Sequence, residues 1–383
     1  MAQQQWGAPP RYGAQPQYGQ PSYGQAQPRP GYPPAPPGYP PYGAPGGYGQ
    51  PQFGRGPVAG FGGQQFGVPQ YGPPPNVPGP RRSSPLKVLM IALIGICVLA
   101  LGGLVIAGLL SGTSDVAYQN DDYKVPPPDK NPPPLPLPKT YEEATQFIVK
   151  NPFYDQTAPL PVRCNSQPIN VGTASDEVLK SHFEGLMECL LRVWQPPVTK
   201  GGFLIVRPTV TIYSTEITTK CGKSGVNAFY CSGDQQIYYS NKLDDEIPIV
   251  KDNKWAAEVV MAHEFGHALQ ARTGILISAH ALGANSNDKD TELEFSRRLE
   301  VQADCLSGMF VRAVSQSLGV QQSDLNGIEQ TYVAVGDDTL TGKPDIVGNH
   351  GHAVNRKYWG DMGIGTSAVG KCNTFVAPKS LVR

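Results

Sequence analysis

Apolar residues in the second half of the chain recur with the period of an amphipathic helix in four places. In Asp176–Trp194 they fall at every third or fourth position, so that one face of a helix would be apolar. Ser175 or Asp176 stands before the first apolar position and can cap this helix. The same spacing predicts three further helices, over 254–272, 291–314 and 324–335.

Two stretches rich in Val, Ile, Thr and Tyr predict β-strands, at 203–213 and 236–240. Because the strands come before most of the helices and do not alternate with them, the pattern favours an α+β domain. The second strand precedes the helix predicted over 254–272. We expect an extended peptide to pair with strand 236–240 by strand addition.

A different pattern occupies residues 88–110, an apolar run without a single charge. At ~1.5 Å per residue, a helix of this length spans the ~30 Å hydrocarbon core of a bilayer with some tilt. A buried core helix seldom lacks a polar face over so long a run, and a signal peptide is shorter and lies nearer the N-terminus. Residues 88–110 are therefore predicted to form one transmembrane helix.

Residues 1–87 repeat Tyr-Gly, Pro-Gln and Pro-Gly units and contain almost no Val, Ile or Leu. Such a segment cannot bury enough apolar surface to offset its conformational entropy. It is predicted to be a disordered tail with local polyproline II character. Its spaced tyrosines suit either a solvated tail without a partner or a docking and self-association segment, and composition identifies no partner.

Charge divides the chain at the same place. The formal net charge is zero, but residues 1–87 carry +6 without an acidic residue, so the remainder carries −6. Basic residues precede the apolar run and acidic residues follow it: Arg81, Arg82 and Lys87 before, Asp115, Asp121 and Asp122 after. The positive-inside rule then places the N-terminus in the cytoplasm and everything after the run outside the cytoplasmic membrane. No feature predicts a nucleic-acid partner.

Residues 111–138 contain closely spaced prolines, which predict an extended, semi-rigid linker between the membrane and the next domain. The remaining residues, 139–383, have the apolar content of one α+β domain. The cysteines outside the apolar run all follow it, and their even number suits up to three disulfides in an oxidising compartment. Buried free thiols are the alternative. Cys221 and Cys231 flank a glycine-containing turn, so a local bridge could close a hairpin-like loop.

The candidate chemistry lies in the helix predicted over 254–272, which contains the sequence His263-Glu264-Phe265-Gly266-His267. Residues four apart on a helix share a face, so both imidazoles can bind one Zn²⁺. Glu264 lies about 60° from His267 around the helix and can reach a water beside the metal. A carboxylate there can act as general base toward the water and then as general acid toward the leaving amine.

A catalytic zinc needs three protein ligands and an open fourth position, and no third histidine follows at the metzincin spacing. The helix predicted over 291–314 offers Glu300 and, four residues on, Asp304. Glu300 can be the third ligand, while Asp304 can accept the outer N–H of a ligand histidine. Glu292 and Glu294 are alternative ligands, and solvated surface carboxylates are the remaining interpretation. Two histidines and a glutamate form the thermolysin-like ligand set.

Five separated blocks occur in order along the chain: HEFGHALQ, LEVQADCLSG, VGDD at 335–338, His350-Gly351 with Arg356 and Trp359, and CNTF at 372–375. Over roughly 200–378 the chain resembles the putative neutral zinc metallopeptidase family, a bacterial, membrane-anchored group. The resemblance implies a thermolysin-like (gluzincin-type) α+β domain with one catalytic Zn²⁺. It implies zinc ligation by His263, His267 and Glu300, with Glu264 as the general base.

The resemblance also carries disulfide pairs. In the family, two pairs of matching cysteines look bonded, which leaves a third pair: Cys221–Cys231, Cys305–Cys372 and, as the remainder, Cys164–Cys189. The second pair would tie the ligand helix beside Asp304 to the C-terminal segment.

A peptidase also needs a group that stabilises the oxyanion of the tetrahedral intermediate. We expect His350 to be this group, with Arg356 and Tyr358 as the next candidates; a structural turn histidine is the alternative for His350. His182 and His280 have no partner motif and are predicted to be structural.

Together these features predict a membrane-tethered zinc endopeptidase that hydrolyses protein or peptide substrates outside the cytoplasmic membrane of a bacterium. One alternative is a non-catalytic, zinc-containing membrane scaffold whose tail recruits partners, although the intact Glu264 argues against it. Another is a zinc amidase that acts on cell-wall peptides, but the sequence contains no recognisable wall-binding module.

Overall fold

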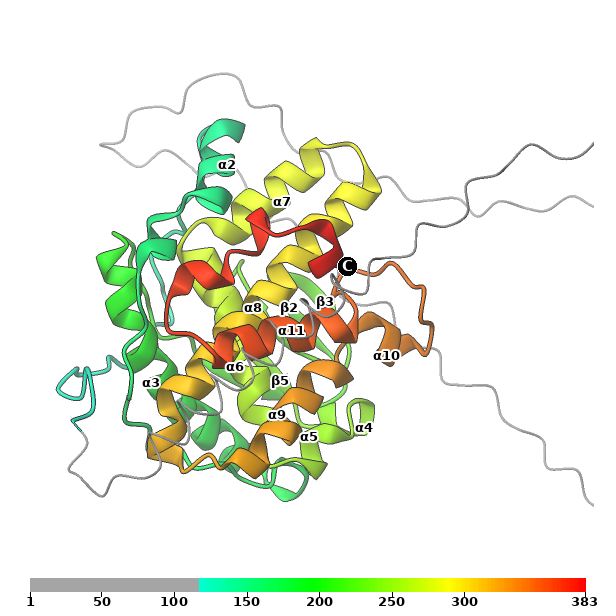
Figure 1. Cartoon of the computed structure of the whole chain (residues 1–383). Coiled ribbons are helices and arrows are strands. Elements are labelled where there is room, and N and C mark those ends of the chain that lie inside the picture. The colour runs from blue at the N-terminus through cyan, green and yellow to red at the C-terminus, as the bar shows by residue number, and fades with distance from the viewer. Residues whose placement is uncertain (1–116) are drawn as a thin grey trace, which may run out of the picture. The chain divides into compact units, whose positions relative to one another are not determined.

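Two long helices lie at the centre of the computed structural model, which describes residues 117–383. These are α6 (Ala256–Arg272) and α8 (Lys289–Leu318), which pack directly against each other (Figure 1). Almost every residue of α6 is buried, because other helices and a sheet cover the sides that α8 leaves open. The rest of the described fold is arranged around this pair.

The other α-helices are α2 (Tyr141–Val149), α3 (Asp176–Lys200), α4 (Leu243–Glu246), α5 (Ile249–Asp252), α7 (Ile275–Asn285), α9 (Gln322–Ala334), α10 (Asp337–Thr341) and α11 (Ala353–Ile364). Helix α8 also contacts α7 and α11, and α6 also contacts α3, α7 and α9. Short 3₁₀ helices complete the described chain: η1 (Pro152–Asp155), η2 (Val171–Thr173), η3 (Val369–Cys372), η4 (Thr374–Val376) and η5 (Lys379–Leu381).

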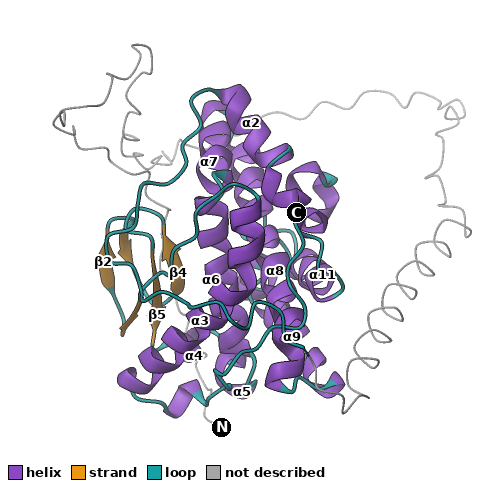
Figure 2. Ribbon diagram, turned by 90° about the vertical axis from the view of Figure 1, so that its left-hand side faces the viewer, coloured by secondary structure: helices purple, strands orange, loops and turns teal. Residues whose placement is uncertain are grey.

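A small mixed sheet lies on one side of the helices (Figure 2). Its strands are arranged in the order β1–β5–β4, with β1 parallel and β4 antiparallel to the central β5. A separate antiparallel ribbon joins β2 to β3. The strands are β1 (Val210–Tyr213), β2 (Ile217–Thr219), β3 (Gly222–Ser224), β4 (Ala228–Cys231) and β5 (Gln236–Ser240). Strand β4, one of the two edge strands, contacts α6. This edge of the sheet therefore lies beside the helix that carries the HExxH sequence.

The predicted α+β class is confirmed, and all four predicted helices are present with ends shifted by a few residues. Helix α3 continues beyond Trp194 to Lys200, with Pro196 and Pro197 near its C-terminus. The predicted strand 203–213 is reduced to its last four residues, because only those pair with β5. The pattern does not predict α7 or α11, since α7 is apolar on most sides and α11 is interrupted by glycines.

The prediction that a peptide pairs with strand 236–240 is wrong. This segment is β5, the central strand, so both of its edges are already hydrogen-bonded to neighbouring strands. An added strand could pair only with β1 or β4 of this sheet, and of these β4 is the one that contacts α6.

Small residues let α8 and α11 approach until their backbones touch. A Cβ atom added to Gly363 of α11 would overlap the carbonyl oxygen of Cys305 on α8. In the same way, a Cβ atom added to Gly308 of α8 would overlap the carbonyl oxygen of Gly360 on α11. This contact fixes the whole of α11 against α8.

The described cysteines form three disulfides, Cys164–Cys189, Cys221–Cys231 and Cys305–Cys372. These are the pairs that the family resemblance implies. The third joins α8 to η3 and so holds the C-terminal segment against the ligand helix.

Part of the predicted linker lies against the domain. Tyr123, Val125 and Leu135 pack on the apolar core. The carbonyl oxygen of Pro133 accepts hydrogen bonds from the side chains of Gln235 (3.0 Å) and Arg272 (3.1 Å). The proline-rich segment is therefore held on the surface of the α+β domain over these residues.

The predicted tail, 1–87, and the predicted transmembrane helix, 88–110, lie outside the described residues. Within 117–383, no helix combines the length and the apolar character needed to cross a membrane.

The backbone contact between α8 and α11 gives a first prediction. Gly363→Ala should lower the free energy of unfolding by about 1–3 kcal/mol, because the added methyl group must push the helices apart. Gly225→Ala is the control: a Cβ atom there meets nothing within 4 Å, so the change should stay within about 0.5 kcal/mol. Urea denaturation of both variants measures the difference, and equal stabilities would contradict the tight helix contact.

Candidate metal centre

The HExxH residues face the interior because α6 comes very close to α8. Gly266 marks the point of contact, where an added Cβ atom would lie 3.0 Å from the Cα of Ala303. Glu300 lies one turn before Ala303 on α8, so the close approach carries its carboxylate to the two histidines of α6. All three side chains, His263, His267 and Glu300, are buried.

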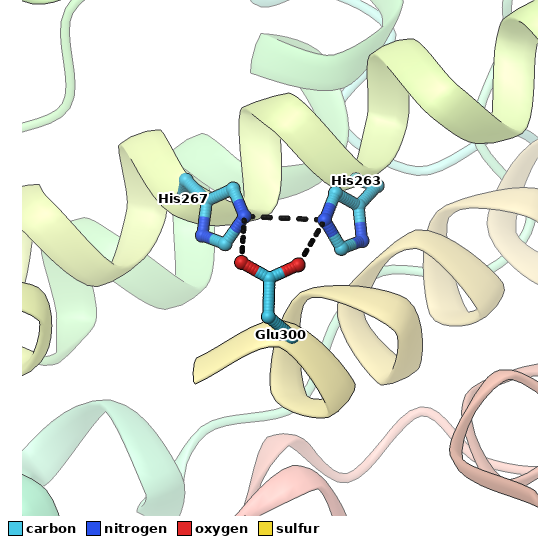
Figure 3. A group of neighbouring side chains, drawn as sticks. All are labelled: His263, His267 and Glu300. Atoms are coloured by element: carbon cyan, nitrogen blue, oxygen red, sulfur yellow. Dashed lines mark hydrogen bonds and ion pairs between the residues drawn. The ribbon is translucent and has the colours of Figure 1, made fainter. Parts of the chain in front are cut away.

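Three ligand atoms converge on one point between the helices (Figure 3). The Nε2 atoms of His263 and His267 are 3.1 Å apart. One carboxylate oxygen of Glu300 lies 3.3 Å from Nε2 of His263, and the other lies 3.5 Å from Nε2 of His267. These are the three residues that the sequence predicts as zinc ligands.

Each histidine is held by a hydrogen bond at its outer ring nitrogen. Nδ1 of His263 lies 2.8 Å from a carboxylate oxygen of Asp304, and Nδ1 of His267 lies 2.9 Å from the amide oxygen of Gln270. Oxygen acceptors at Nδ1 turn the lone pair of each neutral ring toward the shared point at Nε2. A cation at this point, either a proton or a metal ion, would satisfy the two ring nitrogens and the carboxylate together.

This donor set fits Zn²⁺, which takes imidazole nitrogen and carboxylate oxygen in three-ligand catalytic sites. His263, His267 and Glu300 would hold the ion, and the cavity beside them leaves room for a further ligand. Asp304 and Gln270 would orient the two imidazoles from behind.

Burial and neighbouring charges shift the pKa values of the three side chains in different directions. Burial alone would lower the pKa of His263, but Asp304 and Glu300 raise it to about 10. Burial lowers the pKa of His267 to about 4. Burial alone would raise the pKa of Glu300, but the adjacent His267 and His263 bring it well below its usual range. The cluster therefore offers an ionised carboxylate and a neutral imidazole, and a metal would replace the proton on His263.

Arg356 supports the site from α11. Its Nε and Nη2 atoms donate to the two carboxylate oxygens of Asp304, both at 2.8 Å, and its Nη1 donates to the Val335 carbonyl at 3.0 Å. This bidentate pair holds the carboxylate that accepts the hydrogen bond of His263. Arg356, the next candidate for stabilising the oxyanion, lines the cavity, but its guanidinium group is buried and paired with Asp304. Tyr358, the last of these candidates, is 39% exposed and does not line the cavity.

Glu264 is buried, lines the same cavity and is hydrogen-bonded to the edge strand β4. The backbone N–H of Tyr230 in β4 donates to its carboxylate at 2.9 Å. Burial, with a further contribution from the charge of Glu300, raises the pKa of Glu264 to about 8. A carboxyl group whose pKa lies near neutrality can both accept and return a proton.

A cavity of about 510 Å³ opens beside the three ligand residues. One wall is the segment 224–228, which runs from β3 into β4, and another is the N-terminal half of α6. The opposite wall comes from α9, α10 and the segment 346–350. Apart from the site residues themselves, the lining is mainly apolar, with Leu243, Ile247, Val259, Val260, Val335, Leu340 and Ile346.

His350 lies in this cavity wall and is paired with Asp337. Its Nδ1 lies 3.3 Å from one carboxylate oxygen of Asp337, while the backbone N–H groups of His350 and Gly351 donate to the other at 3.0 and 2.8 Å. Asp337 is buried and therefore fixes both the loop and the imidazole. The pairing leaves the other ring nitrogen, Nε2, on the side of the imidazole away from Asp337.

The sequence profile described as "Putative neutral zinc metallopeptidase" matches residues 155–375, more than half of the chain. The chain belongs to this family. The match covers the HExxH helix, the helix with Glu300 and Asp304, and the loop with His350. The resemblance found in the motifs is thereby confirmed.

Relatives of this chain occur in Escherichia coli and Mycobacterium tuberculosis. The uncharacterized protein YpfJ of Escherichia coli (strain K12) is 29% identical over 192 residues, which is 48% of this chain and 66% of YpfJ. The uncharacterized protein Rv2575 of Mycobacterium tuberculosis (strain ATCC 25618 / H37Rv) is 30% identical over 207 residues, which is 48% of this chain and 67% of Rv2575. The chain thus spans slightly less than two thirds of YpfJ. No solved structure matches it.

The two alternative metal ligands considered from the sequence, Glu292 and Glu294, lie away from the site. Glu292 pairs with Lys289 at 3.0 Å on the exposed start of α8. Glu294 pairs with Arg298 at 2.8 Å and does not line the cavity. Neither belongs to the group of side chains that could hold a metal ion within 117–383.

The other two histidines of interest lie in α3 and α7. His182 forms a buried pair with Glu258 of α6 at 2.9 Å, as expected for a structural residue. His280 lies in α7, and burial lowers its pKa. Neither lines the cavity beside the candidate ligands.

Three contributors to the site have no distinct local signal in the sequence: Asp337, Gln270 and the backbone N–H of Tyr230. Asp337 belongs to the VGDD block and Gln270 to the HEFGHALQ block, so the family motifs contain both. The hydrogen bond from Tyr230 depends on the position of β4 against α6, which no local pattern encodes.

Proposed function

We propose that the chain is a gluzincin-type zinc peptidase in which His263, His267 and Glu300 hold one catalytic Zn²⁺ and Glu264 is the general base. The observation that carries the proposal is the convergence of three buried ligand atoms beside a carboxyl group that faces the same cavity. A purely structural zinc site has no need of such a carboxyl group, or of an open cavity. The family to which the chain belongs supports the same reaction class.

When bound, zinc supplies a Lewis acid that polarises the scissile carbonyl and activates a water molecule. Glu264 takes a proton from the attacking water and later delivers it to the leaving nitrogen. The N–H of Tyr230 keeps the carboxylate turned toward the cavity during both steps. Asp304, itself held by Arg356, fixes the ring of His263.

An extended peptide is the substrate form that the sheet edge supports. The N–H of Ser240 donates to the carbonyl of Asn227, and the register pairs Ala228 with Tyr239. In an antiparallel pair, hydrogen-bonded and non-hydrogen-bonded residues alternate, so the backbone groups of Ala228 point away from β5. Ala228 also lines the cavity. A peptide strand that pairs with this residue would pass beside the metal ligands.

The apolar lining of the cavity supports substrates with a hydrophobic side chain next to the scissile bond. Val259 and Val260 precede His263 by about one turn of α6, so such a side chain would lie beside the reacting carbonyl. Burying an aliphatic side chain there contributes about 1.5–3 kcal/mol to binding.

His350 is the candidate for stabilising the oxyanion, and Asp337 would position its ring. His350→Gln should lower kcat by about 10²–10³-fold while leaving the zinc content unchanged, because the residue is not a ligand. His352→Gln is the matched control, since this neighbouring histidine does not line the cavity. Steady-state kinetics with metal analysis compares the two. A normal kcat in His350→Gln would remove this residue from the mechanism.

The reaction itself is tested with Glu264→Gln, which keeps the shape of the side chain but removes the base. The variant should retain one zinc per chain and lose peptide hydrolysis by about 10²–10⁴-fold. Glu258→Gln changes another buried glutamate of the same helix outside the cavity, and should remain active. Both are incubated with a proteome-derived peptide library and analysed by mass spectrometry.

Hydrolysis that survives in Glu264→Gln would rule out the proposed mechanism. A wild-type chain that binds zinc but cleaves no peptide of the library would favour the alternative, a non-catalytic scaffold.

We also propose that residues 88–110 anchor the protein in the cytoplasmic membrane of a bacterium, with the N-terminus in the cytoplasm and the metallopeptidase domain outside. The apolar run, its flanking charges and the three disulfides support this arrangement. Protease added to spheroplasts should digest the domain and spare an N-terminal epitope tag. Digestion only after lysis would contradict the orientation.

A further inference from the structure

A chain of buried side-chain amides runs from His267 to the C-terminal segment. The amide oxygen of Gln270 faces Nδ1 of His267 at 2.9 Å. The amide nitrogen of Gln270 donates to the carbonyl of Leu299 at 2.7 Å and to the amide oxygen of Gln302 at 3.2 Å. The amide nitrogen of Gln302 in turn donates to the carbonyl of Cys372 at 3.0 Å.

Both glutamines are almost completely buried, so their orientations are set by protein groups alone. Gln270 is 0% exposed and Gln302 is 1% exposed. Tyr154 adds one more contact, since its hydroxyl oxygen accepts from Gln302 at 3.0 Å. All the polar atoms of the two amides are hydrogen-bonded within the described residues.

The direction of this relay follows from its backbone end. A carbonyl oxygen can only accept, so Cys372 requires the NH₂ group of Gln302 and turns the oxygen of Gln302 toward Gln270. That oxygen, together with the Leu299 carbonyl, requires the NH₂ group of Gln270. The oxygen of Gln270 is thereby turned toward His267, and it can be satisfied only by a proton on Nδ1.

The two histidines of the site are therefore fixed by different means. His263 has a carboxylate behind it, and a carboxylate accepts whichever way it rotates. His267 has an amide behind it, and an amide offers either an acceptor or a donor, depending on its orientation. A reversed amide would direct N–H groups at Nδ1 and favour a proton on Nε2, where the metal must bind. Of the two histidines, only His267 therefore needs an amide that further hydrogen bonds hold in one orientation.

We propose that Gln270 and Gln302 are positioning residues that hold His267 with its proton on Nδ1 and its Nε2 lone pair turned to the metal. The proposal rests on the zinc site of the proposed function and does not depend on the substrate. The Cys305–Cys372 disulfide contributes by holding the accepting carbonyl of Cys372 against α8, where Gln302 lies.

The experiment measures Zn²⁺ binding by the full chain in competition with a chelator of known affinity. Gln270→Leu removes the acceptor at Nδ1 and should weaken zinc binding about 10–100-fold, as is typical for the loss of such a partner. Gln302→Leu leaves Gln270 anchored by the Leu299 carbonyl alone and should cause a smaller loss, of about threefold to tenfold.

Thr273→Val is the matched control, because it removes a buried hydroxyl group from the same end of α6 that contacts only the backbone carbonyls of Leu269 and Gln270 and neither side-chain amide of the relay. Its zinc affinity should stay within twofold of the wild type. Gln270→Met carries the same expectation as Gln270→Leu and replaces it where the leucine variant does not fold.

A second measurement reports the protonation state of the His267 imidazole. In the zinc-loaded wild type, ¹⁵N NMR of labelled histidine should show His267 protonated at Nδ1 and metal-bound at Nε2. In Gln270→Leu this single signature should be replaced by a mixture of ring states or by loss of the metal-bound signal. If Gln270 had only a structural role, its replacement would lower the stability of the protein without changing the zinc affinity or the NMR signature of His267.

An unchanged zinc affinity in Gln270→Leu, together with an unchanged His267 signature, would overturn the proposal. An equal loss of zinc affinity in Thr273→Val would overturn the proposal as well. The loss would then come from disturbing the C-terminal end of α6 and not from the relay. Failure of the wild-type chain to bind zinc would instead refute the proposed zinc site. Loss of peptidase activity with normal zinc binding bears only on the proposed reaction.

Discussion

The close approach of α6 to α8 at Gly266 and Ala303 is the constraint on which the site depends. A helix with two histidines four residues apart provides only two ligand atoms on one of its faces. The third ligand comes from a different helix, and its carboxylate reaches both Nε2 atoms only because no side chain at residue 266 separates the two backbones. The glycine within the HExxH sequence is thus a packing requirement of the metal site.

The same packing also buries charged side chains, which must therefore be paired with one another. Glu300, Asp304 and Arg356 are almost completely buried together with the two histidines, and removing charges from water is costly unless each is paired. The bidentate contact between Arg356 and Asp304 and the contacts of Glu300 with both imidazoles meet this need. Arg356 reaches Asp304 because glycines let α11 touch α8. The close contacts between the helices therefore pair the buried charges of the site and also set the positions of its ligand residues.

Much of the site is predictable from the sequence because its ligands follow local rules. The i, i+4 spacing puts His263 and His267 on one face, and the same spacing links Glu300 to Asp304, so helical periodicity alone pairs them. The errors have a common cause. The edge strand beside α6 is β4, not the segment 236–240, and Arg356 is committed to Asp304, because contacts between distant segments depend on how the elements pack. The amide relay from Gln270 also depends on hydrogen bonds between distant segments and has no periodic signal.

By itself, the sequence determined the main helices, the pair of imidazoles with the adjacent carboxyl group, and the family. These depend on backbone periodicity and residue chemistry, which act over a few neighbouring positions. Only the tertiary structure decided which strand borders the cavity, which groups hold each histidine and how Asp337 supports His350. Those relations join residues far apart in the chain, and the burial that makes their hydrogen bonds obligatory exists only after the helices and the sheet have packed.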